Sequence, residues 1–435
     1  MSGNRKWKRS LRLDFRYENY NILLESQTRI EIIPPPSDPI EQADDYNGYY
    51  VKLTDGEGRV IYVQRLQNPF RTETEAYGED AASRVTYERL KDPDLTFSIL
   101  IPDPGFVFTL EIINNPLLPE FFFKLARQTF TFTIDPAEDI LRPMVVARVV
   151  ENGTILGKEK IVDHGNDSEC WTIAILAEGY RAEEMPKFLS DADKFITTFK
   201  NFSPFNEFWH KTNVYILKVA STDSGADLPA QCQGGAPPVD VKTYFNASFC
   251  GAQNTKRLLV VDKPTAKKVW NNLIPQAHVA FAMVNSGIYG GSGGEVAVFS
   301  TGALASLIGI HELGHSFFNL ADEYEDPYTD FNPENYPNVT GKTLLSQIKW
   351  KDLIKPATPI PTSRNQCPGG NPVSHPVPEG TVGLFEGALY KSCNVFRPEK
   401  DCLMRTPTRP KFCAVCNRAI RNKLVQLLGT DEPFV

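Results

Sequence analysis

The chain has 435 residues, of which 41% are hydrophobic, a fraction typical of a folded globular protein. This length favours two domains, or one large domain with an appendage, over a single ordinary core. The 46 basic and 53 acidic side chains give a formal charge of −7, and no basic face stands out, which argues against nucleic acid as a partner. No segment approaches the roughly 20 consecutive apolar residues that cross a bilayer. The basic residues 1–13 also lack the apolar stretch of a signal peptide.

The first third of the chain predicts β-structure. Short runs rich in aromatic and β-branched residues recur there, separated by prolines and by turn signals such as residues 54–58, Thr-Asp-Gly-Glu-Gly. The runs are 11–17, 29–33, 49–54, 60–65, 96–101, 106–113, 129–134 and 145–150. Many short strands with frequent turns indicate an antiparallel β-sandwich, which we expect over residues 1–155. Because no titratable groups gather in it, we interpret it as an accessory domain.

The pattern changes after a polar, glycine-containing segment at 151–167, which we predict to be a linker. Apolar runs at 171–177, 213–219, 257–261 and 279–284 predict strands, and 181–201 predicts a helix. Strands that alternate with helices indicate an α/β sheet. We therefore expect a multidomain α+β chain whose second domain spans 168–435.

The strongest chemical signal is the pentapeptide His311-Glu312-Leu313-Gly314-His315. Thr301 is a suitable N-cap for a helix that runs into it. Residues four apart share a helix face, so both imidazoles can reach one zinc ion. Glu312 is placed to take a proton from water as the general base of a metallopeptidase. An amphipathic helix with histidines on its polar face is the alternative interpretation of the pentapeptide alone.

A catalytic zinc ion needs a third protein ligand beyond the two histidines. Two carboxylates follow closely in Leu320-Ala321-Asp322-Glu323-Tyr324. A sharp turn after the helix would bring one of them back to the ion. From this pattern alone either Asp322 or Glu323 is a candidate.

Together these segments resemble the bacterial IgA-peptidase family of zinc metallopeptidases. Similar segments are 174–180 (AILAEGY), 289–294 (YGGSGG), 397–405 (RPEKDCLMR) and 412–416 (FCAVC). The resemblance implies a metzincin-like zincin domain, a peptide substrate and a secreted or periplasmic location. It also implies that Met404 is the Met-turn residue below the zinc site. The metzincin pattern would put glycine at Phe318 and the third ligand at Ala321, which cannot bind metal, so we choose Asp322, with Glu323 as substitute.

The glycine-rich residues 289–294 lack the Lys-Ser/Thr of a phosphate-binding P-loop. We interpret Gly290, Gly291, Gly293 and Gly294 as a segment whose backbone lies close to substrate. Val296–Ser300 would then form the edge strand that pairs with substrate backbone. A flexible hairpin tip is the alternative.

The eight cysteines, several in loop-like sequence, favour disulfides and an extracytoplasmic location. Cys413-Ala414-Val415-Cys416, with Cys393 and Cys402, is a candidate structural zinc site. We favour disulfides that pin the loop around Met404, then metal, then free thiols; a redox pair is least favoured.

Other polar groups are weaker candidates. Glu325, Asp326 and Asp330 suggest either a calcium site or a solvated acidic loop, and the lack of EF-hand spacing favours the loop. Tyr324 or Tyr390 could donate to an oxyanion, although packing is the commoner role. We expect the remaining histidines to be structural or on the surface.

The sequence therefore predicts a zinc metallopeptidase that hydrolyses peptide bonds. The alternative from another class is a secreted binding protein that retains a silent zincin domain as scaffold. The intact pentapeptide argues against it. Hydrolysis of another amide would use the same chemistry.

Overall fold

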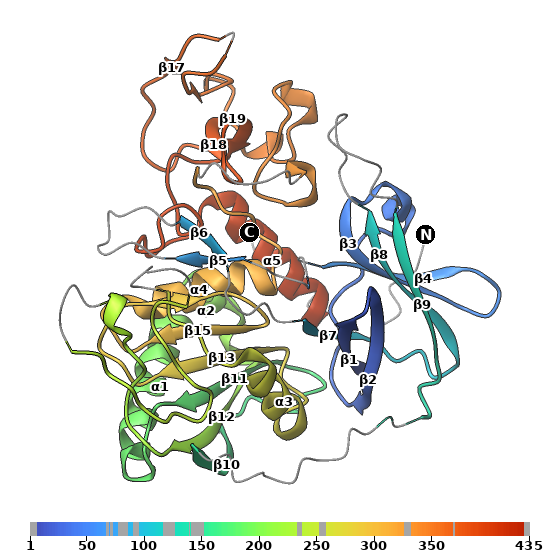
Figure 1. Ribbon diagram of the computed structural model, residues 1–435. Helices are drawn as coiled ribbons and strands as arrows, with labels where there is room; N and C mark the ends of the chain where they lie inside the picture. Colours follow the sequence, from blue (N-terminus) through green and yellow to red (C-terminus); the bar gives the residue numbers. More distant parts are fainter. Residues whose placement is uncertain are drawn as a thin grey trace.

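The protein is a mixed α+β structure with several separate sheets, seen in a computed structural model (Figure 1). It describes residues 7–66, 69, 73–76, 86–89, 95–115, 127–138, 140, 152–232, 237–251, 258–325, 332–368 and 370–429. The predicted strand at 145–150 lies outside these residues, as do Asp326 and Asp330 of the acidic loop. Short 3-10 helices are η1 (Ile40–Asp45), η2 (Ala182–Glu184), η3 (Trp209–Lys211), η4 (Ala230–Cys232), η5 (Pro333–Asn335), η6 (Leu345–Gln347) and η7 (Lys351–Leu353).

Two antiparallel sheets in the first third share one hydrophobic core. One has the order β2-β1-β7 and the other β4-β3-β8-β9. Their strands are β1 (Ser10–Glu18), β2 (Asn21–Ile30), β3 (Gly48–Thr54), β4 (Val60–Leu66), β7 (Thr96–Pro102), β8 (Phe108–Asn115) and β9 (Gln128–Ile134). Alternate β1 residues Leu11, Leu13 and Phe15 are fully buried and cluster with Val51 and Leu110 of the second sheet. Side chains from both sheets therefore form this core. A separate hairpin of β5 (Glu73–Ala76) and β6 (Thr86–Arg89) lies against β14.

A six-stranded sheet carries the rest of the fold, in the order β10-β12-β11-β13-β15-β14. Its strands are β10 (Gly153–Val162), β11 (Trp171–Glu178), β12 (Thr212–Ser221), β13 (Val279–Val284), β14 (Gly291–Ser292) and β15 (Val296–Ser300). The four central strands are parallel, and β10 and β14 pair antiparallel at the two edges.

Three local predictions for this region are wrong. Residues 151–167 are no mere linker, because β10 forms an exposed edge strand there whose polar side chains face solvent. Residues 257–261 contain only isolated bridges at Leu258 and Val260 instead of a strand. Val296–Ser300 is not the outermost strand, because Gly291 and Ser292 of β14 pair with its Phe299 and Val298.

The helices of this region are α1 (Met185–Lys200), α2 (Phe205–Phe208), α3 (Lys263–Leu273), α4 (Ala305–Ser316) and α5 (Ala414–Leu428). Helices α1 and α4 lie on the same face of the sheet, since Gly309 of α4 lies between the rings of Phe195 and Phe299. The predicted N-cap Thr301 is wrong, because α4 begins at Ala305 after Leu304, whose φ is +64°. The hydroxyl of Thr301 donates to the Ser286 carbonyl instead.

A small sheet with the order β17-β16-β18-β19 precedes α5. Its strands are β16 (Ser363–Arg364), β17 (Val373–Ser374), β18 (Phe385–Ala388) and β19 (Lys391–Arg397). Disulfides join Cys232 to Cys250 and Cys367 to Cys393, which fits an extracytoplasmic location. Across the described residues, no helix has the length and apolar character to cross a membrane.

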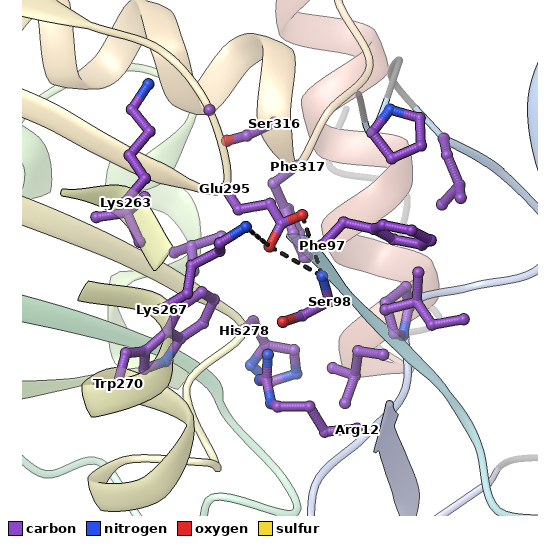
Figure 2. A pocket seen from close by; sticks show the side chains of 18 of the residues that line it. Arg12, Phe97, Ser98, Lys263, Lys267, Trp270, His278, Glu295, Ser316 and Phe317 are labelled. Atoms are coloured by element: carbon purple, nitrogen blue, oxygen red, sulfur yellow. Dashed lines mark hydrogen bonds and ion pairs between the residues drawn. The ribbon is translucent and has the colours of Figure 1, made fainter. Parts of the chain in front are cut away.

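The N-terminal sheets meet α3 and β15 across a seam that contains several buried polar contacts (Figure 2). Buried Arg12 donates to the carbonyls of Pro275 (3.1 Å) and Ala277 (2.6 Å) and lies over the Trp270 ring. The Glu295 carboxylate accepts from the Ser98 amide at 3.0 Å and lies 3.9 Å from Lys267. A cavity of about 190 Å³ opens at this seam. These contacts hold the N-terminal sheets against the larger sheet.

His278 lies on the same seam and is neutral there. Its Nδ1 accepts from the Thr172 amide at 3.0 Å, so Nε2 carries the proton toward the Ile33 carbonyl, 2.9 Å away. Burial lowers the pKa of His278 to about 4. This histidine is structural, as expected.

Candidate metal centre

His311, His315 and Asp322 bring three ligand atoms together in the interior. Nε2 of His311 lies 3.0 Å from Nε2 of His315, and both lie close to Oδ1 of Asp322, at 3.3 and 3.1 Å. The two histidines are one turn apart on α4, and Asp322 returns from the loop that follows. All three side chains are buried. The structure thus brings together the three residues that the sequence singles out as ligands.

Backbone carbonyls set the orientation of both imidazoles. Nδ1 of His311 donates to the Leu403 carbonyl at 3.0 Å, and Nδ1 of His315 donates to the Leu320 carbonyl at 2.7 Å. A carbonyl oxygen can only accept, so the proton of each ring is on Nδ1. Each Nε2 therefore points its lone pair at the common centre, as metal-binding histidines do.

The donor set fits a metal ion. Two imidazole lone pairs and a carboxylate oxygen at 3.0–3.3 Å repel one another unless a cation lies among them. Ligand atoms of a tetrahedral zinc site with bonds of about 2.0–2.1 Å lie about 3.3–3.4 Å apart, close to this spacing.

The turn after α4 explains how Asp322 reaches the histidines. Asn319 adopts the left-handed conformation with φ of +54°, which asparagine tolerates better than most residues. Phe318 does not make the turn and packs on Trp171 and Phe205. The side-chain amide of Asn338 accepts from the N–H of Ala321 and donates to the Ala321 carbonyl, both at 2.8 Å. The turn at Asn319 therefore brings Asp322 rather than Ala321 to the centre.

Tyr390 fixes the second oxygen of Asp322. Its hydroxyl donates to Oδ2, and the Leu389 amide donates to the Asp322 carbonyl at 2.9 Å. The sequence singled out Tyr390 only as an oxyanion donor or a packing residue. Neither Asn338 nor the Leu403 carbonyl gives any sequence signal, because both act through long-range contacts.

The glycine-rich segment lies against Glu312. A Cβ atom at Gly293 would come within 1.9 Å of Oε2 of Glu312, so only glycine fits beside this carboxylate. Gly291 similarly abuts Ile308 of α4, and Gly294 lies near Lys263. The Gly290 carbonyl accepts from the Ser300 amide at 3.1 Å. Gly293 and Gly294 also line the cavity at the polar seam, beside Ser316 at the end of α4.

We expect Gly293→Ala to lower hydrolytic activity at least about 100-fold while metal content stays at the wild-type level. The added methyl group must displace the Glu312 carboxylate, and misplacing a reacting group by about 1 Å can cost a factor of 10². Steady-state cleavage of a peptide and metal analysis of the same sample would measure both effects.

Gly287→Ala is the matched control, because a Cβ atom at this exposed position meets nothing within 4 Å. Wild-type activity in Gly293→Ala would contradict the close approach of Gly293 to the Glu312 carboxylate.

Met404 lies beneath α4 at Gly314. It is fully buried, and a Cβ atom at Gly314 would lie 2.8 Å from its sulfur. The Met404 carbonyl accepts from the Glu323 amide at 2.8 Å, so the loop around Met404 also supports the ligand loop.

Glu323, the substitute third ligand, points elsewhere. Its carboxylate contacts the sulfurs of Cys402 and Cys416 at 3.2 and 3.3 Å. The prediction that disulfides pin the loop around Met404 is wrong, because Cys402, Cys413 and Cys416 are all unpaired, buried cysteines. Cys393 is bound to Cys367 instead, and it takes no part in this cluster.

Two buried histidines on a helix that packs against a mixed sheet, together with an aspartate from the following loop, form an arrangement suited to a metal-dependent hydrolase. The family model described as IgA peptidase M64 matches residues 160–368 and 373–424, and the chain belongs to this family of metallopeptidases. The N-terminal sheets lie outside the match. No curated protein matches the chain.

Proposed function

We propose that the protein is a zinc metallopeptidase in which His311, His315 and Asp322 hold the ion and Glu312 is the general base. The single observation that supports this most is the convergence of the three ligand atoms at 3.0–3.3 Å, with both Nδ1 atoms bound to carbonyls. Zinc held there would polarise the scissile carbonyl and lower the pKa of a water molecule.

Glu312 would carry the proton in this reaction. It occupies the helix position between the two histidines and is not among the converging ligands. It would accept a proton from the attacking water and deliver it to the leaving amine. The four side chains are buried, so a peptide would reach them in a more open conformation than the one described.

We further propose a metzincin-like catalytic domain preceded by an N-terminal β-sandwich domain. The antiparallel edge strand β14 and the position of Met404 under α4 support the metzincin-like comparison. Since β10 pairs with β12, we assign it to the catalytic domain, so the boundary falls before Gly153. The disulfides support a secreted or periplasmic location.

We expect removal of the metal by a chelator to abolish peptide cleavage, and zinc to restore it. The reason is that the metal would supply both the polarisation of the scissile carbonyl and the lowered pKa of the attacking water. Cleavage of a mixed peptide library, followed by mass spectrometry, would measure activity at each stage, with a zinc-saturated chelator as control.

Full cleavage by the metal-free protein would contradict the proposal. Bound zinc without cleavage of any peptide would favour the scaffold alternative, and cleavage of non-peptide amides alone would favour another amidohydrolase.

A further inference from the structure

A second group of ligand atoms lies in the interior, formed by Cys402, Cys413, Cys416 and Glu323. All four side chains are buried, and their ligand atoms lie within 4.8 Å of one another. The carboxylate of Glu323 contacts the three sulfurs at 3.2 Å (Cys402), 3.8 Å (Cys413) and 3.3 Å (Cys416). The proposed peptidase reaction uses none of these groups.

The spacing matches one tetrahedral ion. With Zn–S bonds of about 2.3 Å and Zn–O bonds of about 2.0–2.2 Å, tetrahedral ligand atoms lie about 3.5–3.8 Å apart. Oε1 of Glu323 lies 3.8 Å from the sulfur of Cys413 and 3.3 Å from that of Cys416, on either side of the value for one oxygen and one sulfur ligand. The sulfur of Cys402 lies 3.2 Å from the other oxygen, Oε2. Three thiolates and one carboxylate complete four-fold coordination without an open position, which is the arrangement of a structural zinc site.

The surroundings orient these groups as they would for a bound cation. Cys413 caps the N-terminus of α5, and its sulfur accepts from the Cys416 amide at 3.4 Å, which fixes the position of this sulfur. Asn338 donates to Oε1 of Glu323 at 3.0 Å and so fixes the carboxylate.

We propose that Cys402, Cys413, Cys416 and Glu323 bind a structural zinc ion, separate from the His311–His315–Asp322 centre. Glu323 directly follows the ligand Asp322. Cys402 directly precedes Leu403, whose carbonyl orients His311. The ion would therefore tie the loop that carries the third ligand to the loop that supports the zinc helix and to the start of α5. It would also protect three adjacent thiols from oxidation in the compartment where the two disulfides form.

The proposal is tested on the full chain, purified without reductant and without chelator. In the double variant His311→Ala/His315→Ala, which lacks the first centre, we expect one equivalent of zinc per chain. X-ray absorption should show sulfur neighbours at about 2.3 Å from this ion. Cobalt in the wild-type protein should give a thiolate-to-metal charge-transfer band, which the His-His-Asp centre cannot produce. These measurements do not depend on peptidase activity, so failure of the proposed reaction would leave them interpretable.

Cys416→Ser tests the ligands directly. We expect it to lose one equivalent of zinc and the charge-transfer band. Cys170→Ser is the matched control, because Cys170 is also buried and unpaired but is not in the cluster, and it should keep both. If Cys416→Ser fails to fold, the wild-type cobalt spectrum and the double variant still decide the question. A double variant that binds no metal, sulfur-free coordination, or a Cys413–Cys416 disulfide in the folded protein would overturn the proposal.

Discussion

Glu312→Gln should lower peptide hydrolysis by about 10²- to 10⁴-fold, the usual contribution of a general base, and leave the zinc content unchanged. Glutamine has nearly the shape of glutamate, so the contact with Gly293 persists. Its amide cannot accept the proton of the attacking water. Because Glu312 is not among the three converging ligand atoms, the metal should stay bound. Cleavage rates and zinc analysis on one preparation measure both effects.

Exposed Glu169→Gln serves as the matched control for the change in charge and should cleave at the wild-type rate. Two results would count against the role of Glu312. Near-normal turnover in the Gln variant would remove it as the base, and parallel loss of zinc would make it a ligand.

Asp322→Ala is the second change with a large expected effect, because it should remove the third ligand. We expect zinc affinity at the His311–His315 centre to fall by more than 100-fold, and hydrolysis with it. For comparison, the loss of a hydrogen-bonding partner of a ligand costs about 10- to 100-fold. Competition with a chelator of known affinity would measure the fall.

Tyr390→Phe provides a graded comparison, because it removes only the hydroxyl that donates to Oδ2 of Asp322. We expect its zinc affinity to fall by about 10- to 100-fold. Unchanged affinity in Asp322→Ala would show that Asp322 is not a ligand.

The parts of the site that depend on local sequence were predictable. Residues four apart on a helix share a face, so His311 and His315 could be paired from spacing alone. The position of Asp322 rather than Glu323 at the centre depends on the left-handed turn at Asn319 and on the hydrogen bonds between Asn338 and Ala321. Neither contact has a local signature.

The cysteines and edge strands were harder to predict for a different reason. Pairing depends on which loops meet in space, and eight cysteines allow about 105 complete pairings. Exposed β10 has no continuous apolar run, so it resembled a linker. Central strands such as β11 and β13 are buried throughout and were predicted from their unbroken apolar sequence.

The contact between Met404 and Gly314 makes oxidation a reporter of local opening. A sulfoxide would add a polar oxygen to a sulfur that already touches the helix carrying both histidines. Since Met404 is fully buried, an oxidant reaches it only when the loop separates from α4. The rate at which Met404 is oxidised therefore measures how often this loop separates from α4 below the metal centre.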